Sequence, residues 1–161
     1  MIQVLFVCLG NICRSPMAEA VFRHQVKQAG LDQVIAIDSA GTGDWHIGHP
    51  PHQGTQDILD KNQIDYKGML ARQVTSDDFV QFTYIIAMDE SNVQNLAGFA
   101  PEPADGEKRA SIHKLLDFAP GRKDKNVPDP YYTGNFQEVY EMVEESCARL
   151  LTYIRDKEQL T

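Results

Sequence analysis

Two side chains near the start of this sequence have the types and the spacing that chemistry on a phosphate-like anion requires. Arg14 lies six residues after Cys8, and Ser15 follows it directly. A cysteine thiolate is a strong nucleophile, and the planar guanidinium of an arginine can bind two oxygens of a phosphoryl group at once. Ser15 could donate a hydrogen bond to the Cys8 sulfur and so favour the thiolate. Each residue alone has a plain structural explanation, but together they indicate a nucleophilic site.

The backbone between these residues is suited to binding an anion. Cys8 ends an apolar run and Pro16 opens a helical pattern, so the segment joins a strand directly to a helix. Successive N–H groups in such a loop, with the positive end of the helix dipole, form a concave anion site, and these surroundings should keep Cys8 a thiolate at neutral pH. Gly10 and Asn11 tolerate the left-handed backbone of a tight turn. The expected phosphate-binding groups belong to Leu9, Gly10, Asn11, Ile12, Cys13 and Arg14.

Displacing an alkoxide or phenoxide from phosphorus also needs a proton donor, because the leaving group departs with a negative charge. Asp129 is the best candidate. It lies between Pro128 and Pro130, which stiffen the loop, and neighbouring aromatic side chains could shield its carboxyl so that it stays protonated. An aspartate between prolines can also be a simple turn residue. The need for a partner to Cys8 favours the catalytic interpretation.

The elements that must position these groups alternate between strand and helix patterns. Short apolar runs at 4–7, 34–37 and 84–88 predict buried parallel strands, and 112–118 is a weaker fourth candidate. Apolar periodicity predicts helices over 16–29 and 135–156, with Asn135 as an N-cap and Cys147 on the core face. This alternation predicts a three-layer α/β fold with a parallel sheet and helices on both faces, where ligands bind at the carboxyl ends of the strands.

The composition is typical of one globular domain spanning residues 1–161, with 42% apolar and 24% charged residues. The net charge of −8 disfavours unspecific binding to nucleic acid or to an anionic membrane. No apolar run approaches the roughly 20 residues that span a bilayer. The first residues lack a basic leader and a cleavage site, and three cysteines are too few for a disulfide framework. We therefore expect reduced thiols and a cytoplasmic location.

With these residues in view, the sequence resembles the low-molecular-weight protein tyrosine phosphatases over nearly its whole length. The resemblance rests on residues 8–16, 38–42, 71–73, 88–92 and 129–132. It implies a flavodoxin-like, four-stranded parallel sheet and hydrolysis of phosphotyrosine and small aryl phosphates through a cysteinyl-phosphate, with no metal and no organic cofactor. It also implies that Cys8 is the nucleophile, that Arg14 clamps the transition state, and that Asp129 acts as general acid and then as base.

The sequence departs from this family in the support of the nucleophile loop. Members often carry a histidine shortly before the Ala-Arg pair, hydrogen-bonded to the asparagine and serine of the loop, whereas this chain has Met69 there. The other supporting residues, Asn11, Ser15 and Ser39, are present. Because a methionine cannot donate a proper hydrogen bond, support for the loop must come from elsewhere.

Three aromatic residues are candidates for binding the substrate ring. The resemblance implies that Trp45, Tyr131 and Tyr132 wall a slot for a flat phenyl ring, which a short phosphoserine could not cross to reach the loop. Trp45 could instead simply anchor its own loop. The resemblance also permits a tyrosine kinase to phosphorylate Tyr131 or Tyr132, so the expected partners are tyrosine-phosphorylated proteins and such a kinase.

Three histidines at intervals of three residues, His46, His49 and His52, could suggest a metal site. Pro50 and Pro51 break a helical arrangement, and neither a carboxylate nor a cysteine accompanies the histidines at ligand spacing. We therefore expect them to be solvent-exposed loop residues.

Two other functions fit parts of the pattern. A thiol-dependent arsenate reductase would share the fold and the loop, but its relay of further cysteines is missing between Cys13 and Cys147. A non-catalytic phosphopeptide-binding or redox-sensing module could pair Cys8 with Cys13, although Asp129 argues against a role in binding alone. In an enzyme, Cys13 could still be the thiol that rescues an oxidised Cys8 as a disulfide, or it could simply pack under the loop.

Overall fold

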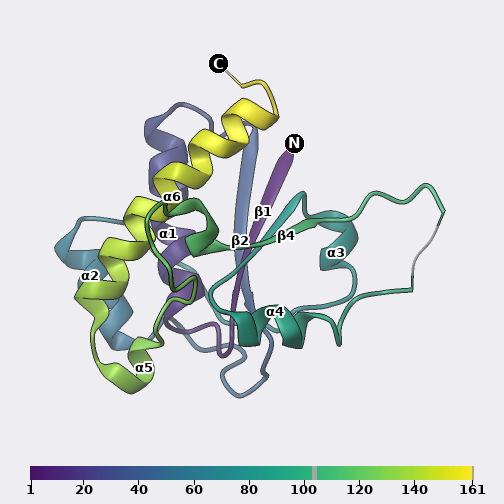
Figure 1. Ribbon diagram of the computed structural model, residues 1–161. Helices are drawn as coiled ribbons and strands as arrows, with labels where there is room; N and C mark the ends of the chain where they lie inside the picture. Colours follow the sequence, from purple (N-terminus) through teal and green to yellow (C-terminus); the bar gives the residue numbers. More distant parts are fainter. Residues whose placement is uncertain (103–104, 161) are drawn as a thin grey trace.

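The computed structural model describes residues 1–102 and 105–160. Its centre is a four-stranded parallel sheet in the order β2-β1-β3-β4, covered by helices on both faces (Figure 1). The strands are β1 (Ile2–Cys8), β2 (Ile35–Gly41), β3 (Tyr84–Ala87) and β4 (Ser111–Lys114). Because all four run in the same direction, their carboxyl ends meet at one edge of the sheet, the lower edge in Figure 1. The predicted three-layer α/β architecture is confirmed.

The helices divide between the two faces of the sheet. They are α1 (Arg14–Gln28), α2 (Gln53–Lys61), α3 (Asp78–Gln81), α4 (Glu90–Leu96), the 3-10 helix η1 (Leu115–Phe118), α5 (Pro130–Thr133) and α6 (Phe136–Lys157). The long helices α1 and α6 lie together on one face, and α3 and α4 lie on the other (Figure 1). None of the helices in the described residues is both long enough and apolar enough to cross a membrane.

Strand β1 is central in the sheet and is buried from Val4 to Cys8. Val4, Phe6 and Cys8 contribute to the large core on the α1 and α6 side, whereas Leu5 and Val7 contribute to the smaller core on the α3 and α4 side. Burial on both faces explains why the strand reads as one continuous apolar run. Each large apolar side chain that is removed from water stabilises the fold by roughly 1.5–3 kcal/mol.

Helix α6 follows the predicted pattern. The Asn135 side chain accepts a hydrogen bond from the Glu138 amide and caps the helix. Cys147 is fully buried on the apolar face, between the equally buried Val143 and Leu150, so its assignment to the core is confirmed.

All four predicted strands differ from the structure at their ends, by one or two residues in β1 and β3 and by more in the other two. The second strand continues beyond Ile37 to Gly41, since its backbone pairs with β1 along the whole length. The segment 112–118 divides into β4 and η1. None of the helices α2, α3, α4 and α5 is predicted from the sequence, because each has only four to nine residues, too few to repeat an apolar face over several turns.

Candidate active site

The loop after β1 curls around the Cys8 sulfur. The Asn11 amide at 3.3 Å and the Ser15 amide at 3.5 Å donate to this atom, and the Ser15 hydroxyl lies within hydrogen-bond distance of it at 2.9 Å. The left-handed backbone falls on Asn11, with φ of 58°, and not on Gly10. Gly10 is small for another reason, because a Cβ there would lie 3.0 Å from Cδ2 of His46. The loop therefore holds the sulfur at the floor of a backbone cradle.

Helix α1 begins directly at this cradle. Within the described part of the chain, Cys13 at the N-cap makes no capping hydrogen bond through its side chain. The amides of the first turn therefore keep their positive end directed toward the loop, as an anion site requires. Pro16 lies in the first turn, where its missing N–H costs no helical hydrogen bond.

Arg14 is buried beside the cradle and is held by groups that follow it by 75 to 115 residues in the sequence. Its Nη1 donates to Asp89 Oδ2 at 2.6 Å and to the Val127 carbonyl at 3.0 Å, and its Nη2 lies 3.4 Å from Asp129 Oδ2. Burial alone lowers the pKa of Arg14, but the Cys8 sulfur and the Asp89 carboxylate raise it more, so the net direction is upward. The guanidinium therefore stays charged.

Asp129 is fixed at the start of α5. Its Oδ1 accepts the Tyr131 amide at 3.0 Å, which makes it the N-cap, and its Oδ2 is the oxygen that approaches Arg14. Its side chain is 22% exposed at the pocket wall. One carboxylate oxygen is therefore used to hold the residue in place, and the other lies near the groups that would bind an oxyanion.

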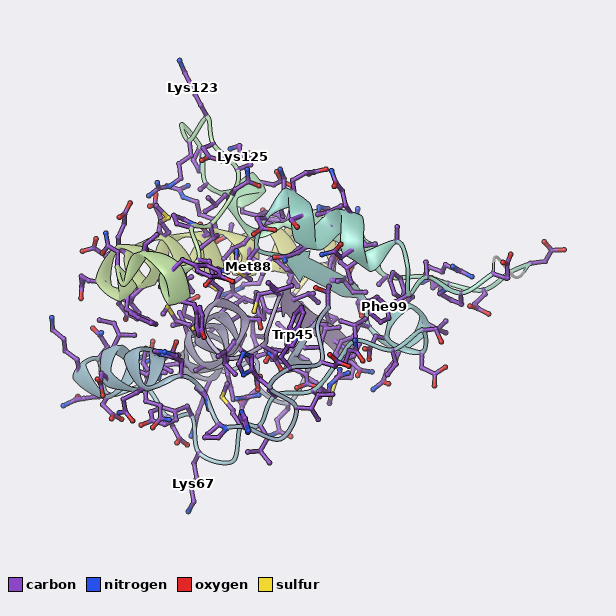
Figure 2. The ribbon with its side chains drawn as sticks, turned by 90° about the horizontal axis from the view of Figure 1, so that it is seen from below. Trp45, Lys67, Met88, Phe99, Lys123 and Lys125 are labelled. Atoms are coloured by element: carbon purple, nitrogen blue, oxygen red, sulfur yellow. The ribbon has the colours of Figure 1, made fainter. Side chains whose placement is uncertain are left out.

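These groups share one cavity of about 340 Å³, a size that suits a small ligand. It is lined by Cys8, Leu9, Gly10, Ile12, Cys13, Arg14, Trp45, His46, Asp129, Tyr131 and Tyr132. Trp45, Tyr131 and Tyr132 are exposed around its mouth, and Figure 2, which views the molecule from below, shows Trp45 near the middle of this face. The structure thus brings the predicted catalytic and ring-binding residues to one pocket.

The histidines do not all lie free in solvent as expected. Only His49 is exposed, whereas His46 and His52 are half-buried. The His46 ring lies against Tyr131, with centroids 6.4 Å apart, and it lines the pocket. His52 accepts the Gly54 amide and stacks on Phe136. The aromatic side chains nearby explain the burial of these two rings. Among the described residues, no group of three or more His, Cys, Asp or Glu side chains is placed to hold a metal ion.

The supporting residues lie behind the loop. Asn11 donates from Nδ2 to the Ser15 hydroxyl at 2.7 Å and to the Ser39 hydroxyl at 2.9 Å. Met69 packs against the core instead of joining this network. The Ser39 hydroxyl donates to Glu19 Oε1 at 2.6 Å, so a buried carboxylate completes the network.

Cys13 is buried at the opposite end of the loop from Cys8, and both are free thiols. Burial, reinforced by the charge of the Cys8 sulfur, raises the pKa of Cys13 to about 12. Cys13 is therefore a neutral thiol at physiological pH.

Two further residues of the site escaped the sequence reasoning. Asp89 enters only as part of the segment 88–92 that carries the resemblance, and nothing in the sequence points to Glu19. Their partners Arg14 and Ser39 lie 75 and 20 residues away in the sequence. No local pattern signals such pairs.

Comparisons with known proteins agree with this geometry. A family model described as low molecular weight phosphotyrosine protein phosphatase matches residues 3–160. The low molecular weight protein-tyrosine-phosphatase YfkJ of Bacillus subtilis is 53% identical over 161 residues, which cover 99% of this chain and 100% of that protein. The crystal structure of YfkJ has a TM-score of 0.90 at 51% identity, covering 98% of this chain and 96% of that one. The crystal structure of DARP, described as a drosophila arginine phosphatase, has a TM-score of 0.87 at 35% identity and covers 96% and 98%.

Proposed function

Since this chain belongs to the low molecular weight phosphotyrosine protein phosphatase family and is a protein tyrosine phosphatase, we propose that Cys8, Arg14 and Asp129 carry its reaction. The observation behind the proposal is that all three line the same cavity, at the carboxyl end of the central strand. We also propose that residues 1–161 form a single domain, which the two cores on either side of one sheet support.

In the first step, the Cys8 thiolate attacks phosphorus from the floor of the cradle. A sulfur–phosphorus bond forms while the bond from phosphorus to the phenolic oxygen breaks. Asp129 transfers its proton to that oxygen, so the tyrosine leaves as a neutral phenol. The equatorial phosphoryl oxygens are bound by the loop amides and by Arg14, whose charge offsets the negative charge of the transition state.

In the second step, water attacks the cysteinyl-phosphate. Asp129, now ionised, takes a proton from this water, the sulfur–phosphorus bond breaks, and inorganic phosphate is released. The Ser15 hydroxyl at 2.9 Å stabilises the sulfur as it leaves as a thiolate. The enzyme returns to its starting state without any other reactant.

The walls of the pocket support an aromatic substrate. Trp45, Tyr131 and Tyr132 stand at the mouth, and Tyr131 and Tyr132 meet edge to face with centroids 5.2 Å apart. A phenyl ring can pack between such side chains, whereas a phosphoserine has no ring to fill this space. The substrates are therefore tyrosine-phosphorylated proteins.

Regulation by a tyrosine kinase is a further part of the proposal. Tyr131 and Tyr132 are 52% and 76% exposed, which makes their hydroxyls accessible to such an enzyme. We place the protein in the cytoplasm, where the nucleophile would remain a reduced thiol.

A substrate panel and one variant test this function. Purified protein should hydrolyse para-nitrophenyl phosphate and a phosphotyrosine peptide much faster than a phosphoserine peptide, and phosphoarginine is included because DARP is described as an arginine phosphatase. Cys8→Ser should abolish turnover and retain phosphate binding, since the amides and Arg14 remain. Substantial hydrolysis by Cys8→Ser would overturn the nucleophile assignment, and binding without turnover by the wild type would leave a binding module.

A further inference from the structure

We propose that Glu19 is a positioning residue that directs the proton of Ser15 onto the Cys8 sulfur, through Ser39 and Asn11. The inference rests on the proposed function only in taking Cys8 as the nucleophile. It explains how the loop is supported in a chain that has Met69 in place of a histidine.

The first step is the state of Glu19 itself. The residue is 5% exposed in α1, one of its oxygens pairs with Arg23, and the other accepts the Ser39 hydroxyl at 2.6 Å. A buried carboxylate is costly unless it is paired and hydrogen-bonded, and here both conditions hold. An ionised carboxylate only accepts hydrogen bonds, so the proton of Ser39 must point toward Glu19.

The second step is the orientation of the Asn11 amide. Its Oδ1 accepts the backbone N–H of Arg72 at 3.0 Å. Because the Ser39 hydroxyl donates its hydrogen to Glu19, its oxygen can only accept a hydrogen bond from Asn11. Both neighbours therefore favour the same orientation, in which Nδ2 faces Ser39 and Ser15.

The third step concerns Ser15. Its oxygen accepts a hydrogen bond from Asn11 Nδ2 at 2.7 Å. The remaining polar neighbour is the Cys8 sulfur at 2.9 Å, so the Ser15 hydroxyl donates to that sulfur. This hydrogen bond favours the thiolate, both as the attacking group and as the leaving group.

The substitution Glu19→Gln distinguishes this series of hydrogen bonds from a purely electrostatic effect of the Glu19 charge on Cys8. Arg23 is only a donor, so it attracts the amide oxygen and leaves the NH2 group facing Ser39. The Ser39 proton is then free to turn toward Asn11, and the hydrogen bond from Asn11 Nδ2 to Ser39 is lost. With the Asn11 amide held only by the Arg72 N–H, its hydrogen bond to Ser15 weakens, and the Ser15 hydroxyl is directed less firmly onto the Cys8 sulfur. We expect the pH midpoint for alkylation of Cys8 by iodoacetamide to rise by about half to one unit. Loss of a negative charge alone would lower this midpoint.

The experiment follows Cys8 alkylation against pH, by mass spectrometry and by loss of activity. Glu141→Gln, an exposed substitution on α6, is the control and should keep the wild-type midpoint. Arg23→Ala alone is measured beside it, so that the effect of losing the partner of Glu19 is known separately. The double variant Glu19→Gln with Arg23→Ala frees the amide oxygen to accept from Ser39, so the midpoint should return toward the wild-type value. This rescue is not expected of a residue that only stabilises the fold.

Several outcomes would overturn the proposal: an unchanged or lowered midpoint in Glu19→Gln, or no recovery in the double variant. If Glu19→Gln fails to fold, the neutral and similarly sized Glu19→Met tests the same upward shift, and an unchanged midpoint there has the same meaning. If alkylation of Cys8 leaves the activity intact, the nucleophile assignment fails instead. The two failures are therefore distinguishable.

Discussion

Arg14 and Asp89 form an ion pair, with 2.6 Å between Nη1 and Oδ2. The second oxygen of Asp89 accepts the Asn92 amide at 2.8 Å and caps α4. The same carboxylate therefore caps the start of α4 and orients the guanidinium of Arg14, the first residue of α1. It ties the loop after β3 to the loop after β1.

Asp89→Asn should show what this pair contributes. The asparagine can still cap α4, but Arg14 loses a charged partner while it stays buried, so we expect a loss of about 1–3 kcal/mol in the free energy of unfolding. Inorganic phosphate supplies a new negative charge, so it should raise the melting temperature more in the variant than in the wild type. Thermal unfolding with increasing phosphate measures both effects, and equal phosphate shifts would contradict this role for Asp89.

Asp129→Asn should slow the reaction according to the leaving group. An aryl phosphate with a basic leaving group needs its proton, whereas one with an acidic leaving group departs readily without it. We expect kcat to fall by about 10²–10⁴-fold for the first kind and much less for the second. A series of substituted phenyl phosphates tests this expectation. A uniform loss across the series would mean that the acid lies elsewhere.

Cys13→Ser should make inactivation by peroxide harder to reverse. In the wild type we expect a disulfide between Cys8 and Cys13, detectable by mass spectrometry, and recovery with a thiol reductant. Because burial raises the pKa of Cys13 to about 12, its thiolate fraction and the rate of disulfide formation should rise steeply between pH 7 and pH 9. If the wild type and Cys13→Ser recover equally and no such bond is found, Cys13 only packs under the loop.

Cys147→Ala should flatten the alkaline loss of stability. Complete burial raises the pKa of Cys147 above its ordinary value of 9.0. The pKa of this thiol is higher in the folded state than in the unfolded state. The buried neutral thiol therefore contributes its full stabilisation below the unfolded-state pKa, and this contribution is lost as the pH rises from there toward the folded-state pKa. The wild type should therefore lose about 1.4 kcal/mol more per pH unit than the variant above pH 9. Urea unfolding from pH 7 to pH 10.5 measures the difference, and parallel curves would exclude this linkage.

The sequence could predict what depends on local pattern. The apolar runs that became β1 and β3, the periodic faces of α1 and α6 and the cap at Asn135 all arise from neighbouring residues, and the sheet follows from their alternation. The strand–loop–helix arrangement around Cys8 is local too, so this loop could be examined first.

Tertiary pairing accounts for what the sequence could not predict. Glu19 looks like an ordinary surface residue of a helix until Ser39 lies beside it. His46 reads as a loop histidine, and only the folding of its loop against Tyr131 brings it to the pocket. Residues 38–41 look like a polar loop but pair with β1 through their backbone, which side-chain patterns do not reveal.

The long reach of Arg14 has a consequence for how the protein is made. Its partners Val127 and Asp129 follow it by 113 and 115 residues. A ribosome that synthesises the chain from the N-terminus therefore releases Cys8 early, long before the residues that complete its surroundings. Because N-terminal segments emerge first and long-range contacts form late, a growing chain holds a cysteine but not yet a finished active site. Catalytic competence arises only after Val127 and Asp129 have left the ribosome and folded onto the loop after β1.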